Sequence, residues 1–194
     1  MKTNYKVKLD GFTIIEVTLV LGIAGLIFLM MFIALPALQR QERDTEREED
    51  ITHLLTEIKH YQTNNRGALP GIVEETVENP ISYDSSSAIQ PITWKGFYRD
   101  YLGGSFVDPG GDNYKLFILE CNNNITGDKC GSDVVDVVNN LNSKGFEELD
   151  RNIYIVKQAT CAGSESKGVV ASKNMRKVAA LYKKENSGVY CANT

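Results

Sequence analysis

The stretch from Leu19 to Leu38, LVLGIAGLIFLMMFIALPAL, most constrains the fold, because it contains no charged residue. As an α-helix it rises about 30 Å, which is the thickness of the hydrocarbon core of a bilayer. The polar segment Gln39–Asp50 follows at once and carries nine charged residues in twelve. The sequence therefore predicts a membrane-spanning segment near the N-terminus, and the charge run that follows it is interpreted as a solvated helix face.

The helical pattern continues beyond the charge run. Five apolar residues recur at helical spacing and form a single stripe: Ile51, Leu54, Leu55, Ile58 and Tyr61. The segment Asn64–Gly67 predicts the end of the helix, and Pro70 excludes its continuation. We therefore expect one helix over residues 12–67, near 80 Å long. It is apolar all round over residues 12–38 and amphipathic over residues 39–64.

A carboxylate, Glu16, lies inside the apolar stretch. A lone charge in a membrane helix costs roughly 2.5–3.5 kcal/mol on insertion scales, so it usually has a partner and a function. A secretory signal peptide has its small-residue cleavage site after the apolar core, and no such site appears around residues 34–37. A plain signal anchor remains an alternative, although nothing in an anchor requires Glu16.

The segment Gly11-Phe12-Thr13-Ile14-Ile15-Glu16, with the apolar run after it, resembles the processing site of type IV pilins and pseudopilins. In that family a prepilin peptidase cleaves after the glycine and methylates the new terminal amine. The glutamate at the fifth mature position then meets the terminus of a neighbouring subunit during filament assembly. The resemblance implies cleavage between Gly11 and Phe12, N-methylation of Phe12, and Glu16 as the assembly charge.

The leader, residues 1–11, carries three lysines and one aspartate, which predicts a cytoplasmic N-terminus. The chain after the helix should then lie outside the membrane. Removal of the leader, whose net charge is +2, changes the formal net charge from −4 to −6. This acidic balance excludes a nucleic-acid footprint over the whole surface, but not a local basic patch.

Residues 68–194 are expected to form the head. Four segments have the alternation or apolar density of strands: Tyr114–Glu120, Asn152–Thr160, Arg176–Tyr182 and Gly188–Ala192. Residues 71–91 predict a long loop with room for one short strand, and residues 94–101 a short aromatic helix or turn. Residues 133–141 fit a helix or a strand equally. The predicted fold class is α+β, a long N-terminal helix packed on a small antiparallel β-sheet head.

All four cysteines lie in the part of the chain expected outside the membrane, where disulfides persist. Four cysteines allow three pairings, and the sequence alone does not choose among them. Our preferred pairing is Cys121 with Cys130, closing a short loop, and Cys161 with Cys191, tying the C-terminus to the sheet. The second pair resembles the C-terminal disulfide-bounded region of many pilins. Zinc is not indicated, because no C-x-x-C spacing exists.

The segment DPGGDNY, residues 108–114, predicts a turn that leads into the first clear strand. It resembles the DPxG-and-tyrosine turn of several pilins and pseudopilins. Asp108, Asp112 and Asn113 are weak candidates for calcium ligands, since they offer oxygen atoms without the EF-hand spacing. We prefer the structural turn and assign no metal and no cofactor.

The sequence contains no G-x-S-x-G, no phosphate loop and no paired-histidine metal motif, so we do not expect an enzyme. The resemblance implies the structural subunit of a type IV pilus, serving adhesion, twitching motility or DNA uptake. Prepilin peptidase and the pilus assembly machinery would be its partners, with further copies of the chain. It would span the cytoplasmic membrane once, head outside, before it joins an extracellular filament.

Two alternatives remain open. Within the same fold, the chain could be a type II secretion or DNA-uptake pseudopilin, or a minor pilin. In another class, it could be an uncleaved, signal-anchored extracellular binding domain. The C-terminal third is locally basic through six residues: Lys167, Lys173, Arg176, Lys177, Lys183 and Lys184. This basic group could bind DNA or an acidic partner, or serve as a solvated sheet edge that discourages strand addition.

Overall fold

The structure is a computed structural model that describes residues 11–71, 81, 93–121, 130, 132–143, 151–163, 168–185 and 188–194. Most of the predicted leader and loop, the chain between Cys121 and Cys130, and Lys167 lie outside the described residues. The contacts within the chain divide it into two units, Met1–Arg40 and Gln41–Thr194.

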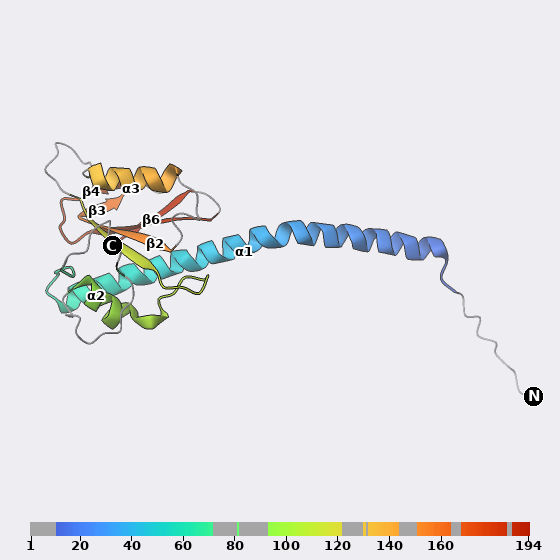
Figure 1. Cartoon of the computed structure of the whole chain (residues 1–194), viewed down its shortest axis with the longest axis horizontal. Coiled ribbons are helices and arrows are strands. Elements are labelled where there is room, and N and C mark those ends of the chain that lie inside the picture. Colours follow the sequence, from blue (N-terminus) through green and yellow to red (C-terminus); the bar gives the residue numbers. More distant parts are fainter. Residues whose placement is uncertain are drawn as a thin grey trace, which may run out of the picture. The chain divides into compact units, whose positions relative to one another are not determined.

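Helix α1, Ile14–Asn64, begins in the first unit and ends in the second (Figure 1). Pro36 lies inside the helix. The helix ends at Asn64, just before Arg66 and Gly67 adopt positive φ angles of 57° and 85°. A backbone in that region cannot continue a right-handed helix, and the N–H of Gly67 instead donates to the carbonyl of Gln62 at 2.6 Å.

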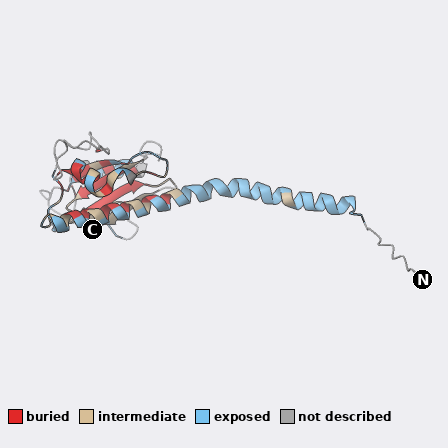
Figure 2. Ribbon diagram, turned by 90° about the horizontal axis from the view of Figure 1, so that it is seen from below, coloured by how far each residue is buried: buried red, intermediate tan, exposed pale blue. Residues whose placement is uncertain are grey.

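The two parts of α1 differ in burial. From Ile14 to Arg40 every side chain is exposed except the partly exposed Ala24 (Figure 2). This part of α1 is long and apolar enough to cross a membrane. In the second unit the predicted apolar stripe, from Ile51 to Tyr61, is buried. Helix α1 therefore packs on the head through its amphipathic part, as the spacing of the stripe predicts.

A four-stranded sheet forms the centre of the second unit, in the order β1-β2-β5-β6. The strands are β1 (Lys115–Glu120), β2 (Asn152–Lys157), β5 (Val178–Lys183) and β6 (Val189–Asn193). Strands β2, β5 and β6 pair antiparallel. The predicted antiparallel sheet is wrong at its first pair, because β1 and β2 are parallel, from Lys115 opposite Asn152 to Glu120 opposite Lys157.

The parallel pair has a physical reason in the connection between its strands. Parallel neighbours need a crossover of a dozen or more residues, usually through a helix. The chain between β1 and β2 contains such a helix, α3 (Ser132–Ser143). Residues 133–141, which fitted helix and strand equally by sequence, are therefore helical, and the sheet is mixed.

The strand predicted over Asn152–Thr160 is divided in two. Gln158 has a φ of 57°, so its backbone is not extended and β2 ends before it. A separate strand, β3 (Ala159–Cys161), begins after it. Strand β3 pairs antiparallel with β4 (Val169–Ala171), which the sequence analysis did not predict. Three residues are too few for a recognisable alternation, so the sequence carries almost no signal for β4.

The sheet is buried on both faces, with α1 against one and α3 against the other (Figure 1). Along β2, Ile153 and Ile155 belong to the core cluster of α1, whereas Tyr154 and Val156 belong to that of α3. This alternation follows from the two-residue period of a strand. The second unit is thus a helix–sheet–helix arrangement with two apolar layers.

The aromatic segment predicted over residues 94–101 is part of the core. It forms helix α2 (Trp94–Phe97) and a π-helical turn, Tyr98–Leu102. The side chain of Thr93 caps α2 by accepting a hydrogen bond from the N–H of Gly96 at 3.1 Å. Trp94, Phe97 and Tyr98 are fully buried in the cluster that contains the α1 stripe.

Candidate functional site

The segment at the start of α1 holds the predicted processing and assembly residues. Thr13 precedes the first helical residue, and its N–H and Oγ1 both donate to Oε2 of Glu16, at 2.9 and 2.8 Å. The N–H of Glu16 lies 3.4 Å from Oγ1 of Thr13. This reciprocal pair is a capping box, which satisfies two N–H groups that a helix start leaves unpaired.

This local role of Glu16 was not among the sequence-based expectations. The signal was present, because a threonine followed three residues later by glutamate, just before an apolar run, is the signature of a capping box. Both hydrogen bonds that the Glu16 carboxylate accepts from Thr13 are made by Oε2. Among the described residues no donor forms a hydrogen bond to Oε1 of Glu16. The capping box therefore leaves half of the carboxylate available to a further partner.

The surroundings of Glu16 are apolar and open. Phe12 is 89% exposed, and a shallow groove runs from Phe12 past Glu16 to Val17, Val20 and Leu21. Apart from the neighbours of Gly11 in the chain, no described residue lies within 4 Å of the position that a Cβ on Gly11 would occupy. An exposed apolar surface of this extent marks a site that lipid or protein covers.

The two preferred disulfide pairings are both present in the structure. Cys121 and Cys130 are bonded with their Cα atoms 4.6 Å apart, and Cys161 and Cys191 with their Cα atoms 5.9 Å apart. The second bond joins β3 to β6, so it fastens the C-terminal strand to the small two-stranded sheet. No cysteine is free.

The predicted turn at residues 108–114 is present, and Asp108 organises it. The N–H of Gly110 donates to Oδ1 of Asp108 at 2.8 Å, and the N–H of Gly111 to its carbonyl at 2.7 Å. Arg47 donates to both carboxylate oxygens of Asp108, at 2.5 and 3.1 Å. Both oxygens of the Asp108 carboxylate are therefore bonded to a guanidinium.

The other two weak calcium candidates also have partners within the chain. Asp112 forms an ion pair with Arg151, and Asn113 pairs with Val107 in an isolated β-bridge. Within the described ranges no group of three His, Cys, Asp or Glu side chains is placed to hold a metal ion. The turn has the contacts of a structural element.

Arg47 is the centre of a charge network in the second unit. Besides Asp108 it contacts Glu185 at 2.6 Å and Asp44 at 3.6 Å. Burial alone lowers the pKa of Arg47, but its hydrogen bonds to Asp108 and Glu185 outweigh burial and raise the pKa. Arg47 and the carboxyl of Asp108 are almost completely buried, where an ion pair is held only by good geometry and further hydrogen bonds.

Glu185 joins this network to the β5–β6 connection. Arg43 donates to both oxygens of its carboxylate, at 2.8 and 2.7 Å, and this contact, with Arg47, holds the pKa of Glu185 at about 2. Asp44 accepts from the hydroxyl of Tyr182 at 2.8 Å and from the N–H of Glu185 at 2.9 Å. The network thus fastens α1 to the turn before β1 and to the end of β5.

The interpretation of the charge run as a solvated face is wrong for Asp44 and Arg47, which are buried. Both lie on the helical register of the apolar stripe, seven and four residues before Ile51. A charged residue in line with an apolar stripe is the signal that could have identified them. Their partners, Asp108 and Glu185, lie far away in sequence and had no such signal.

The predicted basic group is largely engaged within the head. Lys183 is buried, Lys184 pairs with Glu48, and Lys177 donates to the carbonyl of Thr194. Lys173 and Arg176 are exposed. The C-terminal third is therefore not a uniform basic surface.

Comparison of the chain with protein-family models, with curated proteins and with solved structures finds no match.

Proposed function

We propose that this chain is the main structural subunit of a type IV pilus. In this proposal a prepilin peptidase cleaves between Gly11 and Phe12 and methylates the amine of Phe12. The assembly machinery then moves the subunit from the membrane into a helical filament of its own copies. The observation that carries the proposal is the segment from Gly11 to Glu16, placed immediately before a helix whose apolar side chains are exposed up to Leu38.

The exposed apolar part of α1 supports assembly as well as membrane insertion. Such a surface leaves lipid only if an equally apolar environment replaces the lipid, and copies of the same helix supply that environment. Glu16 cannot stay without a positive partner in such a bundle. The amine that cleavage creates on Phe12 of a neighbouring copy is the natural partner for Oε1, which the capping box does not use.

The head supports a location outside the cytoplasmic membrane. Two disulfides in a head of this size suggest an oxidising compartment. The lysine-rich leader favours a cytoplasmic N-terminus, which would place the head on the opposite side of the membrane. The proposed subunit is therefore a single-pass membrane protein before assembly and part of a surface fibre afterwards.

The test combines electron microscopy of surface fibres with mass spectrometry of the chain. We expect fibres composed mainly of this chain, beginning at Phe12 with a methylated amine. Gly11→Leu should leave uncleaved precursor in the membrane, and no contact among the described residues opposes this substitution. A mature chain that begins at Met1, or beyond Ala37, would contradict the proposal. Processed chain that forms only a trace of the fibres would instead indicate a pseudopilin or minor pilin.

A further inference from the structure

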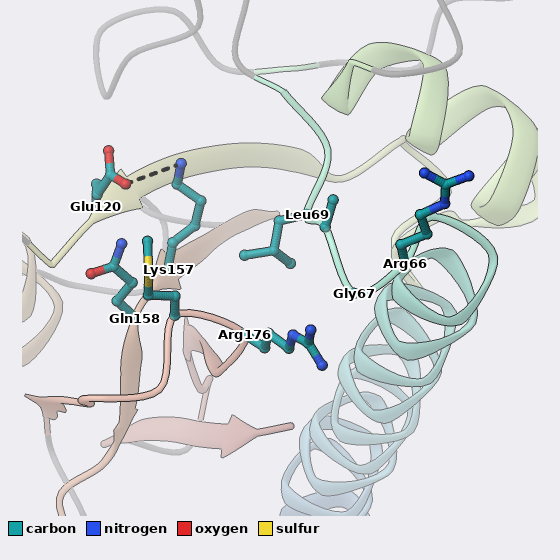
Figure 3. A pocket seen from close by; sticks show the side chains of 9 residues that line it. Arg66, Gly67, Leu69, Glu120, Lys157, Gln158 and Arg176 are labelled. Atoms are coloured by element: carbon teal, nitrogen blue, oxygen red, sulfur yellow. Dashed lines mark ion pairs between the residues drawn. The ribbon is translucent and has the colours of Figure 1, made fainter.

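A pocket of about 420 Å³ lies in the head, away from the segment around Glu16. It is formed where the end of α1 meets the C-terminal ends of β1 and β2 and the turn before β5 (Figure 3). Pockets that hold small molecules typically have volumes of about 300–1,000 Å³. The residues that carry its chemistry are Arg66, Gly67, Leu69, Lys157, Gln158 and Arg176.

The pocket is positively charged, although the whole chain is acidic. Arg66, Lys157 and Arg176 line it together with a single carboxylate, Glu120. Glu120 pairs with Lys157 at 3.4 Å, as the dashed line in Figure 3 marks. Neither arginine forms an ion pair with a carboxylate anywhere in the described chain. Two guanidinium groups are therefore available, and a guanidinium matches a carboxylate or phosphate through two parallel hydrogen bonds.

The backbone of Arg176 is held by two hydrogen bonds to side chains. Its carbonyl accepts from the side chain of Gln62 at 2.8 Å, and its N–H donates to Oδ1 of Asn174 at 3.0 Å. Its guanidinium lies against Gly67, where an added Cβ would be 2.6 Å from Cζ and Nε (Figure 3). The absence of a side chain at position 67 therefore permits this position of the arginine.

The backbone around the pocket adopts uncommon conformations. Among the described residues three that are not glycine have positive φ angles, and two of them, Arg66 and Gln158, line this pocket, each with φ of 57°. Long side chains rarely occupy that region, and such conformations gather at ligand sites, where the surrounding structure holds them. Arg66 lies just after the end of α1, and Gln158 lies between β2 and β3. Helix α1 and strand β2 therefore both end at the pocket.

We propose that this pocket binds a sugar-sized anion, a sugar phosphate or a sugar acid. Arg66 and Arg176 hold the phosphate or carboxylate, and the side-chain amide of Gln158 bonds to ligand hydroxyls. Leu69 and Met175 provide the apolar part of the lining against the sugar ring. This site would let the head recognise acidic carbohydrate. Every residue that lines the pocket lies in the second unit, outside the apolar part of α1 that is proposed to form the filament core, so binding can be tested on the unassembled chain.

The test is a calorimetric titration of the full chain in a non-ionic detergent with glucose 6-phosphate, glucuronate and glucose. We expect saturable binding of one or both charged sugars and none of glucose. Arg176→Gln should weaken binding about tenfold or more, as expected for the loss of hydrogen bonds to a charged group. Lys173→Gln is the matched control, since it removes the same charge from an exposed position outside the pocket. This control should keep the affinity of the native chain.

A second variant separates the position of the arginine from its charge. Gly67→Ala keeps every charge, but it displaces the guanidinium of Arg176 and strains a backbone held at a φ of 85°, so it should weaken binding and also lower the melting temperature. The melting temperature of each variant checks that the head is folded. Equal weakening in Arg176→Gln and Lys173→Gln would overturn the proposal, and so would the absence of saturable binding. Binding of a short single-stranded DNA with no binding of either charged sugar would overturn it in favour of a nucleic-acid surface.

Discussion

The two parts of α1, before and after Arg40, differ in where their apolar and charged residues lie. Before Arg40 the apolar side chains are exposed, whereas after Asp50 the apolar stripe is buried in the head. The only carboxylate of the first part, Glu16, bonds within its own helical turn. The buried carboxylate of Asp44 instead accepts hydrogen bonds from groups far along the chain. Within one chain, the apolar stripe and the buried charges of the second part have their packing and hydrogen-bond partners. The apolar side chains of the first part have no such packing partners among the described residues.

This contrast indicates which part needs other molecules. The head has two apolar layers, a charge network and two disulfides of its own. Among the described residues, the first part of α1 makes hydrogen bonds only within its own turns, including one capping box. Loss of an interaction in the head should therefore lower the stability of the single chain. Loss of an interaction around Glu16 should affect association and leave the head folded.

The largest effect is expected at Glu16. Glu16→Ala should give few or no filaments when it is the only form of the chain present, because the carboxylate proposed to pair with the neighbouring amine is gone. The protein should still accumulate in the membrane, since the uncharged run Leu19–Leu38 is sufficient for insertion. Fibre counts by electron microscopy and membrane immunoblots measure the two outcomes.

Glu16→Gln distinguishes the assembly charge from the capping box. Glutamine can keep the capping box but carries no charge. If the charge is what matters, this variant should assemble as poorly as Glu16→Ala. Normal fibres from Glu16→Gln would show that the helix cap alone is needed, and loss of the protein from the membrane would indicate a role in folding or insertion.

The second prediction concerns Arg47. Arg47→Ala leaves the buried carboxylate of Asp108 without its guanidinium, and Glu185 loses one of its two partners. Breaking a buried ion pair in this way costs about 3–5 kcal/mol of unfolding free energy. Denaturant titration of the full chain in detergent measures the loss. Arg40→Ala, at an exposed position of the same helix, should change the stability by less than about 0.5 kcal/mol. Equal effects of the two substitutions would refute a structural role for the network.

The main elements could be predicted from the sequence, because their signals are local. The spacing from Ile51 to Tyr61 predicts the buried stripe, and four of the six strands in the described residues have their own apolar pattern. The parallel pairing of β1 and β2 could not be predicted, because it depends on a connection whose helix, α3, was not distinguishable from a strand. Whether two strands pair parallel or antiparallel depends on the path of the chain between them. The sequences of the strands themselves do not indicate this direction.

The candidate sites were predictable to different extents. Glu16 stands out because a charge in an apolar stretch is costly. The contact of Arg47 with Asp108 joins residues 61 positions apart, so no local pattern indicates it. The pocket between Arg66 and Arg176 likewise requires the fold to bring together residues that the sequence separates widely. Local rules identified groups that are unusual in their own segment and missed groups that become important only through a distant partner.

The third prediction compares the two disulfides of the head. They close loops with separations of 9 and 30 residues. In the chain-entropy model, removing them costs about 2.5 and 3.5 kcal/mol respectively. The double substitution of Cys161 and Cys191 by alanine should therefore destabilise the head by about 1 kcal/mol more than that of Cys121 and Cys130. Denaturant titration under non-reducing conditions measures both losses. The reverse order would indicate that strain or residual unfolded structure dominates over loop entropy.

The smallest effect is the pH dependence of the head. Hydrogen bonds from Arg43 and Arg47 lower the pKa of Glu185 from 4.5 to about 2. A carboxyl whose pKa is lower in the folded state contributes stability above its unfolded pKa, and this stability is lost as the pH falls towards the folded pKa. We expect the unfolding free energy to fall by about 2 kcal/mol between pH 4.5 and 2. This loss is smaller than the full pKa shift of Glu185 implies, because water partly screens its ion pairs with Arg43 and Arg47.

Glu185→Gln isolates this contribution from that of the other carboxyls. It should be less stable than the native chain at pH 7, and the gap should narrow as the pH falls from 4.5 to 2. Glu46→Gln, which removes a carboxyl from an exposed position of α1, should keep the pH dependence of the native chain. Unfolding free energies measured at several pH values check this. A constant gap between the native chain and Glu185→Gln would mean that the ion pairs of Glu185 do not couple protonation to folding. The charge network would then hold α1 chiefly through Arg47 and Asp108, the most deeply buried ion pair in the described part of the head.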